Sequence, residues 1–245
     1  MRIAALDLGS NSFHLIVVDV NFDGTFSPIV REKEMLRLGD VVARSGEIGE
    51  AAMESAIEVL ARFKTIATAH RVDEIIAVGT AAIREASDGA EFVARAERST
   101  GIVIKVVDGL VEAQTIFAAV RASVLIDPSP ALAIDLGGGS LELMVGDQSG
   151  LAFATSTRLG VGRLTAEYLD DDPPTGPQIK RLNAHIADEL GPVIDEIAEL
   201  KPRMLIGSSG TFACLSRMAA ALRDGLIPDS LNQLSVYSED LKAVA

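Results

Sequence analysis

The sequence predicts an α/β protein built from two related lobes, and three observations lead to this prediction. Residues 7–17 align without gaps with residues 135–145, so the second copy of this repeat begins 128 residues after the first. Short apolar segments alternate with segments of helical periodicity along most of the chain, as in α/β folds. Residues 123–130 include Asp-Pro-Ser-Pro, which breaks helix and strand alike. We therefore expect one lobe over residues 1–124 and a second over residues 125–245.

Each copy of the repeat is predicted to be a β-hairpin with a polar tip. Residues 3–6 and 131–134 are apolar and are expected to form buried strands. The Gly/Ser/Asn-rich cluster that follows each run is typical of a tight turn, and the alternating residues after it of a returning strand. Around the first hairpin we expect a strand over 26–38, a helix over 50–69, a strand over 74–78, mostly helix over 81–100, a strand over 102–107 and a helix from an N-cap at Asp108 through residue 120.

Around the second hairpin the same alternation continues. We expect a strand over 151–158, a helix starting in 162–168, a loop over 170–174, a long helix over 176–200, and a strand over 203–206 whose end, 207–211, opens another helix. Ser238 resembles an N-cap, but the sequence stops at Ala245, too soon for a stable helix. We therefore expect the second lobe to be truncated at its C-terminus.

Composition narrows the functional class. The chain has 22 Lys+Arg against 35 Asp+Glu, a formal charge of −13, which argues against non-specific binding of duplex nucleic acid. No apolar run reaches the length of a membrane helix, and Asp7 interrupts the segment that a secretory signal would need. The single cysteine, Cys214, cannot form an internal disulfide. We expect a cytoplasmic protein with no membrane partner.

The glycine-rich tip at residues 135–140 is a candidate anion site, because backbone N–H groups can converge on an anion where no Cβ intervenes. Taken alone, such a tip is more commonly a plain hairpin turn. Because the tip is duplicated, one copy in each lobe, we expect the two tips to face each other across a cleft and bind one ligand from both sides. Residues 207–211 add a third loop ahead of a helix N-terminus, whose dipole favours anions.

Acidic residues beside these tips suggest a cation. Asp7 and Asp135 end the first strand of each hairpin, where a carboxylate would repel an anion unless a cation intervened. Mg²⁺ held by one or two carboxylates and phosphate oxygens fits these ligands, whereas zinc does not. Alternatively, each aspartate caps its own turn. Glu142 stands between Leu141 and Leu143 and is expected to face outward or into the cleft.

Four further charged residues have both a functional and an ordinary interpretation. Glu112 lies in the first turns of the helix capped by Asp108, aimed at the hinge between the lobes, but it could simply complement the helix dipole. Arg84 follows a strand end, a common place for a phosphate-binding arginine. Arg158 and Arg163 stand on either side of a glycine-containing turn, and each is either a phosphate ligand or a surface residue.

Five segments together resemble one family. The segments DLGSNSFHL, VGTAAIREA, EAQTIF, IDLGGGSLEL and GSSGT, which begin at residues 7, 78, 112, 134 and 207, follow the order and approximate spacing of the exopolyphosphatase/guanosine pentaphosphate phosphohydrolase (Ppx/GppA) family. The resemblance extends from Met1 to the C-terminal region. It implies two ribonuclease-H-like lobes of the actin/Hsp70/sugar-kinase superfamily (actin-like ATPase lobes), with mixed sheets, flanking helices and a cleft between them.

The resemblance also implies roles for individual residues. Glu112 would be the general base for the attacking water, and Arg84 would contact the terminal phosphate. The implied metal ligands are Asp135 and Glu142, with Asp7 joining through water. The implied phosphate-binding residues are Asn11, Ser12, Gly137, Gly138, Gly139, Ser140, Arg158, Gly207, Gly210 and Thr211.

The resemblance implies an enzyme, a phosphoric anhydride hydrolase, with Mg²⁺ as its cofactor; a monovalent cation such as K⁺ and a homodimer are further expectations. The expected function is an exopolyphosphatase that releases terminal orthophosphate from inorganic polyphosphate by water attack. Three alternatives stay open: a hydrolase converting guanosine pentaphosphate (pppGpp) to the tetraphosphate, a catalytically silent phosphate or nucleotide sensor, and a sugar or acetate kinase. Two departures from the family pattern stand out. Leu141 replaces a common threonine, and the C-terminal helical domains of larger members are missing.

Overall fold

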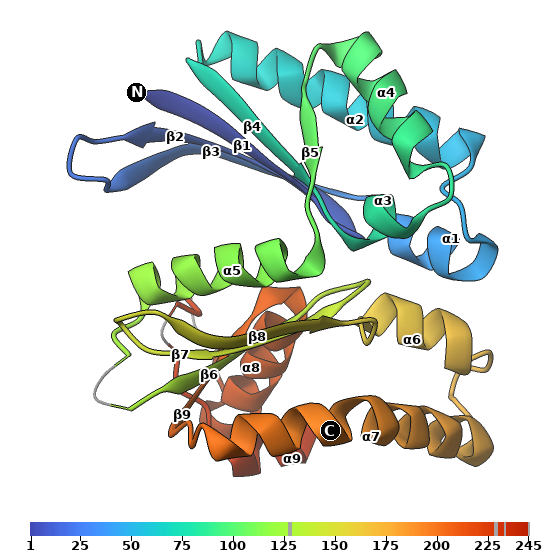
Figure 1. Ribbon diagram of the computed structural model, residues 1–245, viewed down its shortest axis with the longest axis vertical. Helices are drawn as coiled ribbons and strands as arrows, with labels where there is room; N and C mark the ends of the chain where they lie inside the picture. Colours follow the sequence, from blue (N-terminus) through green and yellow to red (C-terminus); the bar gives the residue numbers. More distant parts are fainter. Residues whose placement is uncertain (127–128, 228–229, 233, 245) are drawn as a thin grey trace.

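The computed structural model describes residues 1–126, 129–227, 230–232 and 234–244. It contains two mixed β-sheets, each flanked by helices, which form two lobes with helix α5 between them (Figure 1). This arrangement confirms the prediction of an α/β fold with two related halves. Within the described residues, no helix combines the length and apolar character needed to cross a bilayer.

The first lobe is built on a five-stranded sheet of order β3-β2-β1-β4-β5. Strand β1 is antiparallel to β2 and parallel to β4, so the hairpin of the first repeat lies at the centre of the sheet. The strands are β1 (Arg2–Leu8), β2 (Ser12–Val20), β3 (Phe26–Met35), β4 (Glu74–Gly79) and β5 (Ile104–Val106). The helices are α1 (Leu38–Ser45), α2 (Glu50–Ala69), α3 (Ala81–Glu85) and α4 (Gly89–Thr100).

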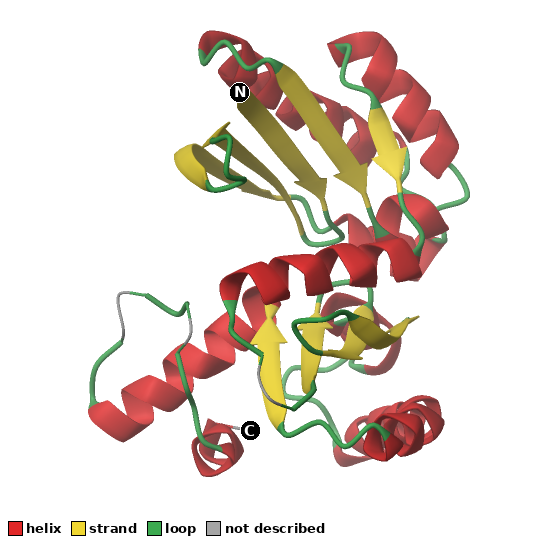
Figure 2. Ribbon diagram, turned by 60° about the vertical axis from the view of Figure 1, so that its left-hand side comes forward, coloured by secondary structure: helices red, strands yellow, loops and turns green. Residues whose placement is uncertain are grey.

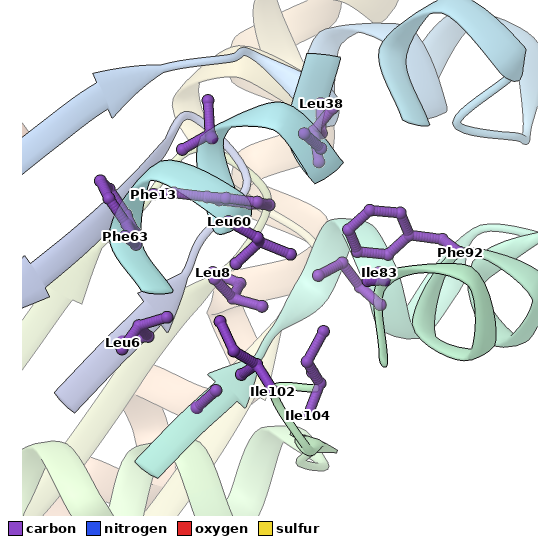
Figure 3. Close-up of a cluster of buried hydrophobic side chains, with 14 of the residues drawn as sticks. Leu6, Leu8, Phe13, Leu38, Leu60, Phe63, Ile83, Phe92, Ile102 and Ile104 are labelled. Atoms are coloured by element: carbon purple, nitrogen blue, oxygen red, sulfur yellow. The ribbon is translucent and has the colours of Figure 1, made fainter. Parts of the chain in front are cut away.

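One face of this sheet carries the core of the first lobe. Alternate residues of β1, including Leu6 and Leu8, point into it and are buried, and Phe63 of α2 and Phe92 of α4 pack in the same cluster (Figure 3). Asp7 therefore points to the opposite face, where it is exposed. The alternation of β1 thus supplies the core with one face and places a carboxylate on the other.

The second lobe repeats the first four strands of this topology, with the order β8-β7-β6-β9. Strand β6 is again antiparallel to its hairpin partner and parallel to the strand on its other side, which confirms the internal repeat as a structural duplication. The strands are β6 (Ala131–Leu136), β7 (Leu141–Gly146), β8 (Leu151–Thr157) and β9 (Met204–Ser208). The helices are α5 (Gly109–Ser123), α6 (Val161–Tyr168), α7 (Gly176–Glu199), α8 (Ser209–Asp224) and α9 (Ser238–Val244).

Helix α5 links the two lobes. It follows β5 directly, yet its buried residues Ala113, Phe117 and Val120 pack against Ala133 and Met144 of the second sheet. Figure 2 shows α5 lying across the molecule between the two sheets. The lobe boundary at residue 124 stays a prediction, and Asp127 and Pro128 lie outside the described residues.

One element was missed, because contacts with a segment distant in sequence end the strand before it. The strand predicted over 26–38 ends at Met35, because the N–H groups of Leu36 and Arg37 bind the carbonyl oxygen of Asn11 instead of extending the ladder. Arg37 then adopts a left-handed conformation and α1 begins. The signal for α1 was present, since Leu38 and Val42 are spaced by four residues and a glycine follows the helix.

Two other helical expectations change. The helix predicted over 81–100 is two helices, α3 and α4, because the Asp88 side chain between them accepts hydrogen bonds from the backbone N–H groups of Ile48 and Gly49. The expectation of no stable helix after Ser238 is wrong. Helix α9 forms there and packs on α8, and Arg223 of α8 pairs with Asp240 of α9.

Candidate active site

The hairpin registers place the predicted acidic residues opposite one another. In the second hairpin Asp135 pairs with Glu142, and on its other side Asp135 pairs with Ser208 of β9. In the first hairpin the equivalent pair is Asp7 and His14. Leu141 and Leu143 pack into the cluster that includes residues of α6 and α7, so Glu142 lies on the opposite face, toward α5. The prediction that Glu142 points away from its apolar neighbours is confirmed, and its side chain is buried rather than open, at 1% exposure.

Four carboxylates, those of Asp7, Glu112, Asp135 and Glu142, influence one another's charge around α5 and the two hairpins. Burial raises the pKa of Glu142 to about 7, with a further contribution from the negative charge of Glu112, although Ser156 Oγ donates a hydrogen bond of 2.7 Å to Glu142 Oε1. The pKa of Asp7 rises to about 6 because the surrounding protein restricts its hydration and because Glu112 and Asp135 are near. Asp7 itself remains exposed by surface area. The mutual repulsion shows that the four groups share one electrostatic site.

Asp135 and Glu112 have polar partners that oppose the effect of burial. Burial raises the pKa of Asp135, while the hydroxyl of Ser208 donates a hydrogen bond to its carboxylate and favours the charged form. Burial also raises the pKa of Glu112, and Arg84 holds it down through a hydrogen bond of 3.0 Å between Arg84 Nη1 and Glu112 Oε2. Asp135 therefore does not simply cap its own turn.

Arg84, the partner of Glu112, also lines a cavity of about 680 Å³ between the lobes. Its Nη1 also donates to the carbonyl oxygen of Val107 at 2.8 Å, which fixes the guanidinium at the start of α5. Gly109 lets α5 approach the second sheet closely, since a Cβ there would overlap Ser156. The cavity is lined by Arg84, Glu85, Asp108, Gly109, Leu110, Ser140, Thr155, Ser156, Thr157 and Arg158.

The two hairpin tips face each other, as expected, but they touch. A Cβ on Gly138 would overlap the Asn11 side chain, and one on Gly139 would overlap the hydroxyl of Ser10. No ligand fits between these pairs in this arrangement. Ser12 is buried, and its Oγ lies 2.8 Å from His14 Nε2. Phosphate binding by Asn11, Ser12, Gly137, Gly138 and Gly139 therefore stays a prediction, and only Ser140 of the predicted loop residues lines the cavity.

The third predicted loop lies at the junction of β9 and α8. Ser208 ends the strand beside Asp135, and Ser209 Oγ donates to the carbonyl oxygen of Leu136 at 2.7 Å, which ties this junction to the second hairpin. Gly210 has open space where a Cβ would lie. Gly207, Gly210 and Thr211 do not line the cavity, and their role in phosphate binding stays a prediction.

The carboxylates are suited to a hard divalent cation, although they do not form a complete metal site by themselves. In the described part of the chain, no three His, Cys, Asp or Glu side chains are gathered closely enough to hold a metal ion by themselves. Mg²⁺ is commonly held by one or two carboxylates and completes its shell with water and phosphate oxygens, so it does not need three protein ligands. Asp135 and Glu142 face each other, and burial raises the pKa of both carboxyl groups, so a cation bound there would favour their charged forms.

Comparison with known proteins identifies the family. Residues 16–243 match the Ppx/GppA phosphatase family. The chain belongs to the Ppx/GppA phosphatase family. "Exopolyphosphatase 1" of Mycobacterium leprae is 33% identical over 237 residues, which cover 96% of this chain and 70% of that protein. The protein of the same name from Mycobacterium tuberculosis is 32% identical and covers 100% of this chain and 74% of its own length.

Solved Ppx/GppA structures share the fold. An exopolyphosphatase from Cytophaga hutchinsonii superposes with a TM-score of 0.90 at 31% identity, covering 100% of this chain and 78% of that one. The Aquifex aeolicus family member gives a TM-score of 0.71 at 29% identity, covering 94% and 72%. The two lobes are thus the actin-like lobes of this family, and the chain is an enzyme of the phosphoric anhydride hydrolase class.

Several Ppx/GppA site neighbours were not among the predicted site residues. Ser156 and Ser208 donate hydrogen bonds to Glu142 and Asp135. Ser10 lies at the tip of the first hairpin, where its Oγ accepts a hydrogen bond from the backbone N–H of Ala82 at 3.1 Å. Ser156 pairs with Glu142 and Ser208 pairs with Asp135 on neighbouring strands, and this pairing could have indicated both serines. Arg163, judged ambiguous from sequence, is buried, and its Nε donates to the carbonyl oxygen of Gly139 at 3.2 Å.

Proposed function

We propose that this chain is a Mg²⁺-dependent exopolyphosphatase that releases terminal orthophosphate from inorganic polyphosphate. The observation that carries the proposal is the cavity between the lobes, whose lining includes Arg158 and Arg84, the ion-pair partner of Glu112. The lining has hydroxyls from Ser140, Ser156 and nearby threonines, and Leu110 is its one large apolar residue. No aromatic side chain is present among these lining residues to stack on a guanine, so the cavity suits a chain of phosphates.

Arg84, Glu112 and the two facing carboxylates would each have a separate task in this reaction. Arg84 would orient the terminal phosphate, and Glu112, held by Arg84, would orient the attacking water and accept its proton. Water would bond to the terminal phosphorus while the bond to the bridging oxygen breaks, so that orthophosphate and a chain shortened by one unit leave. Asp135 and Glu142 would hold Mg²⁺, which supplies charge neutralisation for the phosphate oxygens when bound.

The test is release of phosphate from short and long polyphosphate and from guanosine pentaphosphate, with and without Mg²⁺. Glu112→Gln should lower turnover by roughly 10²- to 10⁴-fold, the range of a lost acid–base group. Glu196→Gln, at an exposed position of α7, is the matched control and should keep full turnover.

Each other outcome has a definite meaning. Full turnover in Glu112→Gln would overturn its role. Faster release from guanosine pentaphosphate than from any polyphosphate would favour the nucleotide hydrolase. Tight polyphosphate binding without release would indicate a sensor, and ADP formation when ATP and an acceptor are supplied instead would indicate a kinase.

A further inference from the structure

One carboxylate of the first lobe binds two arginines of the second. Glu85 ends α3, directly after Arg84. Its Oε2 lies 2.7 Å from Arg158 Nη2 and 2.5 Å from Arg163 Nη2, so both guanidinium groups meet the same oxygen. The three residues come from α3, from the residue after β8 and from α6, and their contact bridges the lobes beside the mouth of the cavity.

The two arginines differ in burial and in their other contacts. Arg163 has a side chain only 8% exposed, and it also donates to the carbonyl oxygen of Gly139 and to Glu167 at 3.4 Å. Arg158 is 71% exposed, lines the cavity and has Glu85 as its ion-pair partner among the described residues. An exposed ion pair of this kind is weak and screened by salt, whereas a buried, multiply bonded one is lost only at a high cost.

We propose that Glu85 is a positioning residue with two tasks: it clamps the lobes through Arg163, and it holds Arg158 until a polyphosphate anion at the cavity mouth takes Arg158 over. The second task rests on the proposed function; the first does not. Because both arginines share one oxygen, the departure of Arg158 leaves Glu85 still paired with Arg163. The clamp therefore survives the handover.

The clamp connects the parts of the site that come from different lobes. Glu85 follows Arg84 in the chain, and Arg163 holds the carbonyl oxygen of Gly139, just before Ser140 of the cavity lining. The distance from Arg84 to Ser140 and Glu142 is therefore set in part by the Glu85–Arg163 contact. Phosphoryl transfer depends mainly on positioning and charge neutralisation, so loosening this contact should lower turnover.

The clamp can be tested without any substrate. Cys214 on α8 is exposed and is the only cysteine in the sequence, so a spin label there and a second at Ser55→Cys on α2 report the distance between the lobes. We expect Glu85→Gln to broaden this distance distribution and Glu167→Gln to leave it unchanged, because Glu167 contacts Arg163 within α6 only. Glu85→Asp, which keeps the charge, should restore part of the narrow distribution and provides the test if the glutamine variant does not fold. An unchanged distribution in both Glu85 variants would overturn the clamp.

The handover of Arg158 is tested by equilibrium binding of inorganic tripolyphosphate in the presence of EDTA. In the native protein, part of the binding free energy that Arg158 contributes is offset by the loss of its contact with Glu85. We expect Arg158→Gln to weaken binding several-fold more in the Glu85→Gln background than in the native one, as a double-mutant cycle measures. Equal effects in both backgrounds would overturn the handover.

The two tests separate the inference from the proposed function. If no background binds tripolyphosphate in EDTA, the handover fails, while phosphate release with Mg²⁺ still decides the proposed function and the spin-label distances still decide the clamp. If polyphosphate is hydrolysed but the Glu85 variants leave both the lobe distance and the binding cycle unchanged, the proposed function stands and this inference fails.

Discussion

At the scale of single residues, Gly160 shows how the junction of the lobes depends on a missing side chain. A Cβ at Gly160 would overlap backbone atoms of Gly138, Gly139 and Ser140, which cannot swing aside as a side chain can. We expect Gly160→Ala to lower the free energy of unfolding by about 1–3 kcal/mol, the usual cost of overpacking. Gly191→Ala, inside α7 with open space around the new Cβ, should instead raise it by about 0.5–1 kcal/mol. Urea unfolding of both variants is the measurement, and equal effects would contradict the packing argument.

A second residue-scale prediction concerns Arg84 and the protonation of Glu112. Arg84 favours the charged form of Glu112 and so opposes the rise in pKa that burial causes. Removing this partner in Arg84→Gln should raise the pKa of Glu112 further, so the acid limb of kcat/KM against pH should move to higher pH, along with a loss of rate. Arg98→Gln, at an exposed position of α4, is the control and should leave the profile unchanged. A lower rate with an unmoved acid limb would mean that Glu112 does not titrate in the reaction.

At the scale of elements, the N-terminus of α5 is the most informative. Asp108 accepts a hydrogen bond of 2.8 Å from Val111 N, which confirms the predicted N-cap. Asp108→Ala should lower the free energy of unfolding by about 1 kcal/mol, and Asp108→Asn should retain most of that, because asparagine caps almost equally well. Thermal or urea unfolding would measure the difference. If the asparagine variant lost as much as the alanine variant, the charge of Asp108 rather than its capping bond would be responsible.

Elements were predictable from sequence where one pattern determined them locally. The repeat identified both hairpins, and the alternation of β7 placed Glu142 on the face opposite Leu141 and Leu143. Helix α1 was missed because the bonds from Leu36 and Arg37 to Asn11, which end β3, join segments that are distant in sequence. The grouping of Glu85 with Arg158 and Arg163 depends in the same way on how the lobes meet. Periodicity carries no information about contacts between residues that are distant in sequence. The individual residues of the candidate site were therefore predictable, whereas the contacts that bring the two lobes together were not.

At the scale of the whole molecule, the shared carboxylates should make stability depend on pH. The pKa of Asp7 rises from 3.8 to about 6, and that of Glu142 from 4.5 to about 7. A carboxyl group whose pKa is raised by folding binds its proton more tightly in the folded state. Its stabilising contribution is therefore complete below the unfolded pKa and is lost as pH rises through the folded one. Considered by themselves, these two groups should make the metal-free protein less stable as pH rises from about 4 to about 7.

A cation bound by these carboxylates should reverse that loss, so Mg²⁺ and pH should act together on the melting temperature. Mg²⁺ at about 100 times its Kd would add about 2.7 kcal/mol, or roughly 5–10 °C for a chain of this size. We expect that increase at pH 8 and a much smaller one at pH 5.5, where protons compete for Glu142 and Asp7. Glu142→Gln should be less sensitive to pH between 5.5 and 8 and should gain little from Mg²⁺ at either pH. Thermal melts after EDTA treatment provide the measurement. An equal Mg²⁺ effect at both pH values, or an undiminished one in Glu142→Gln, would place the cation elsewhere and remove Glu142 from its ligands.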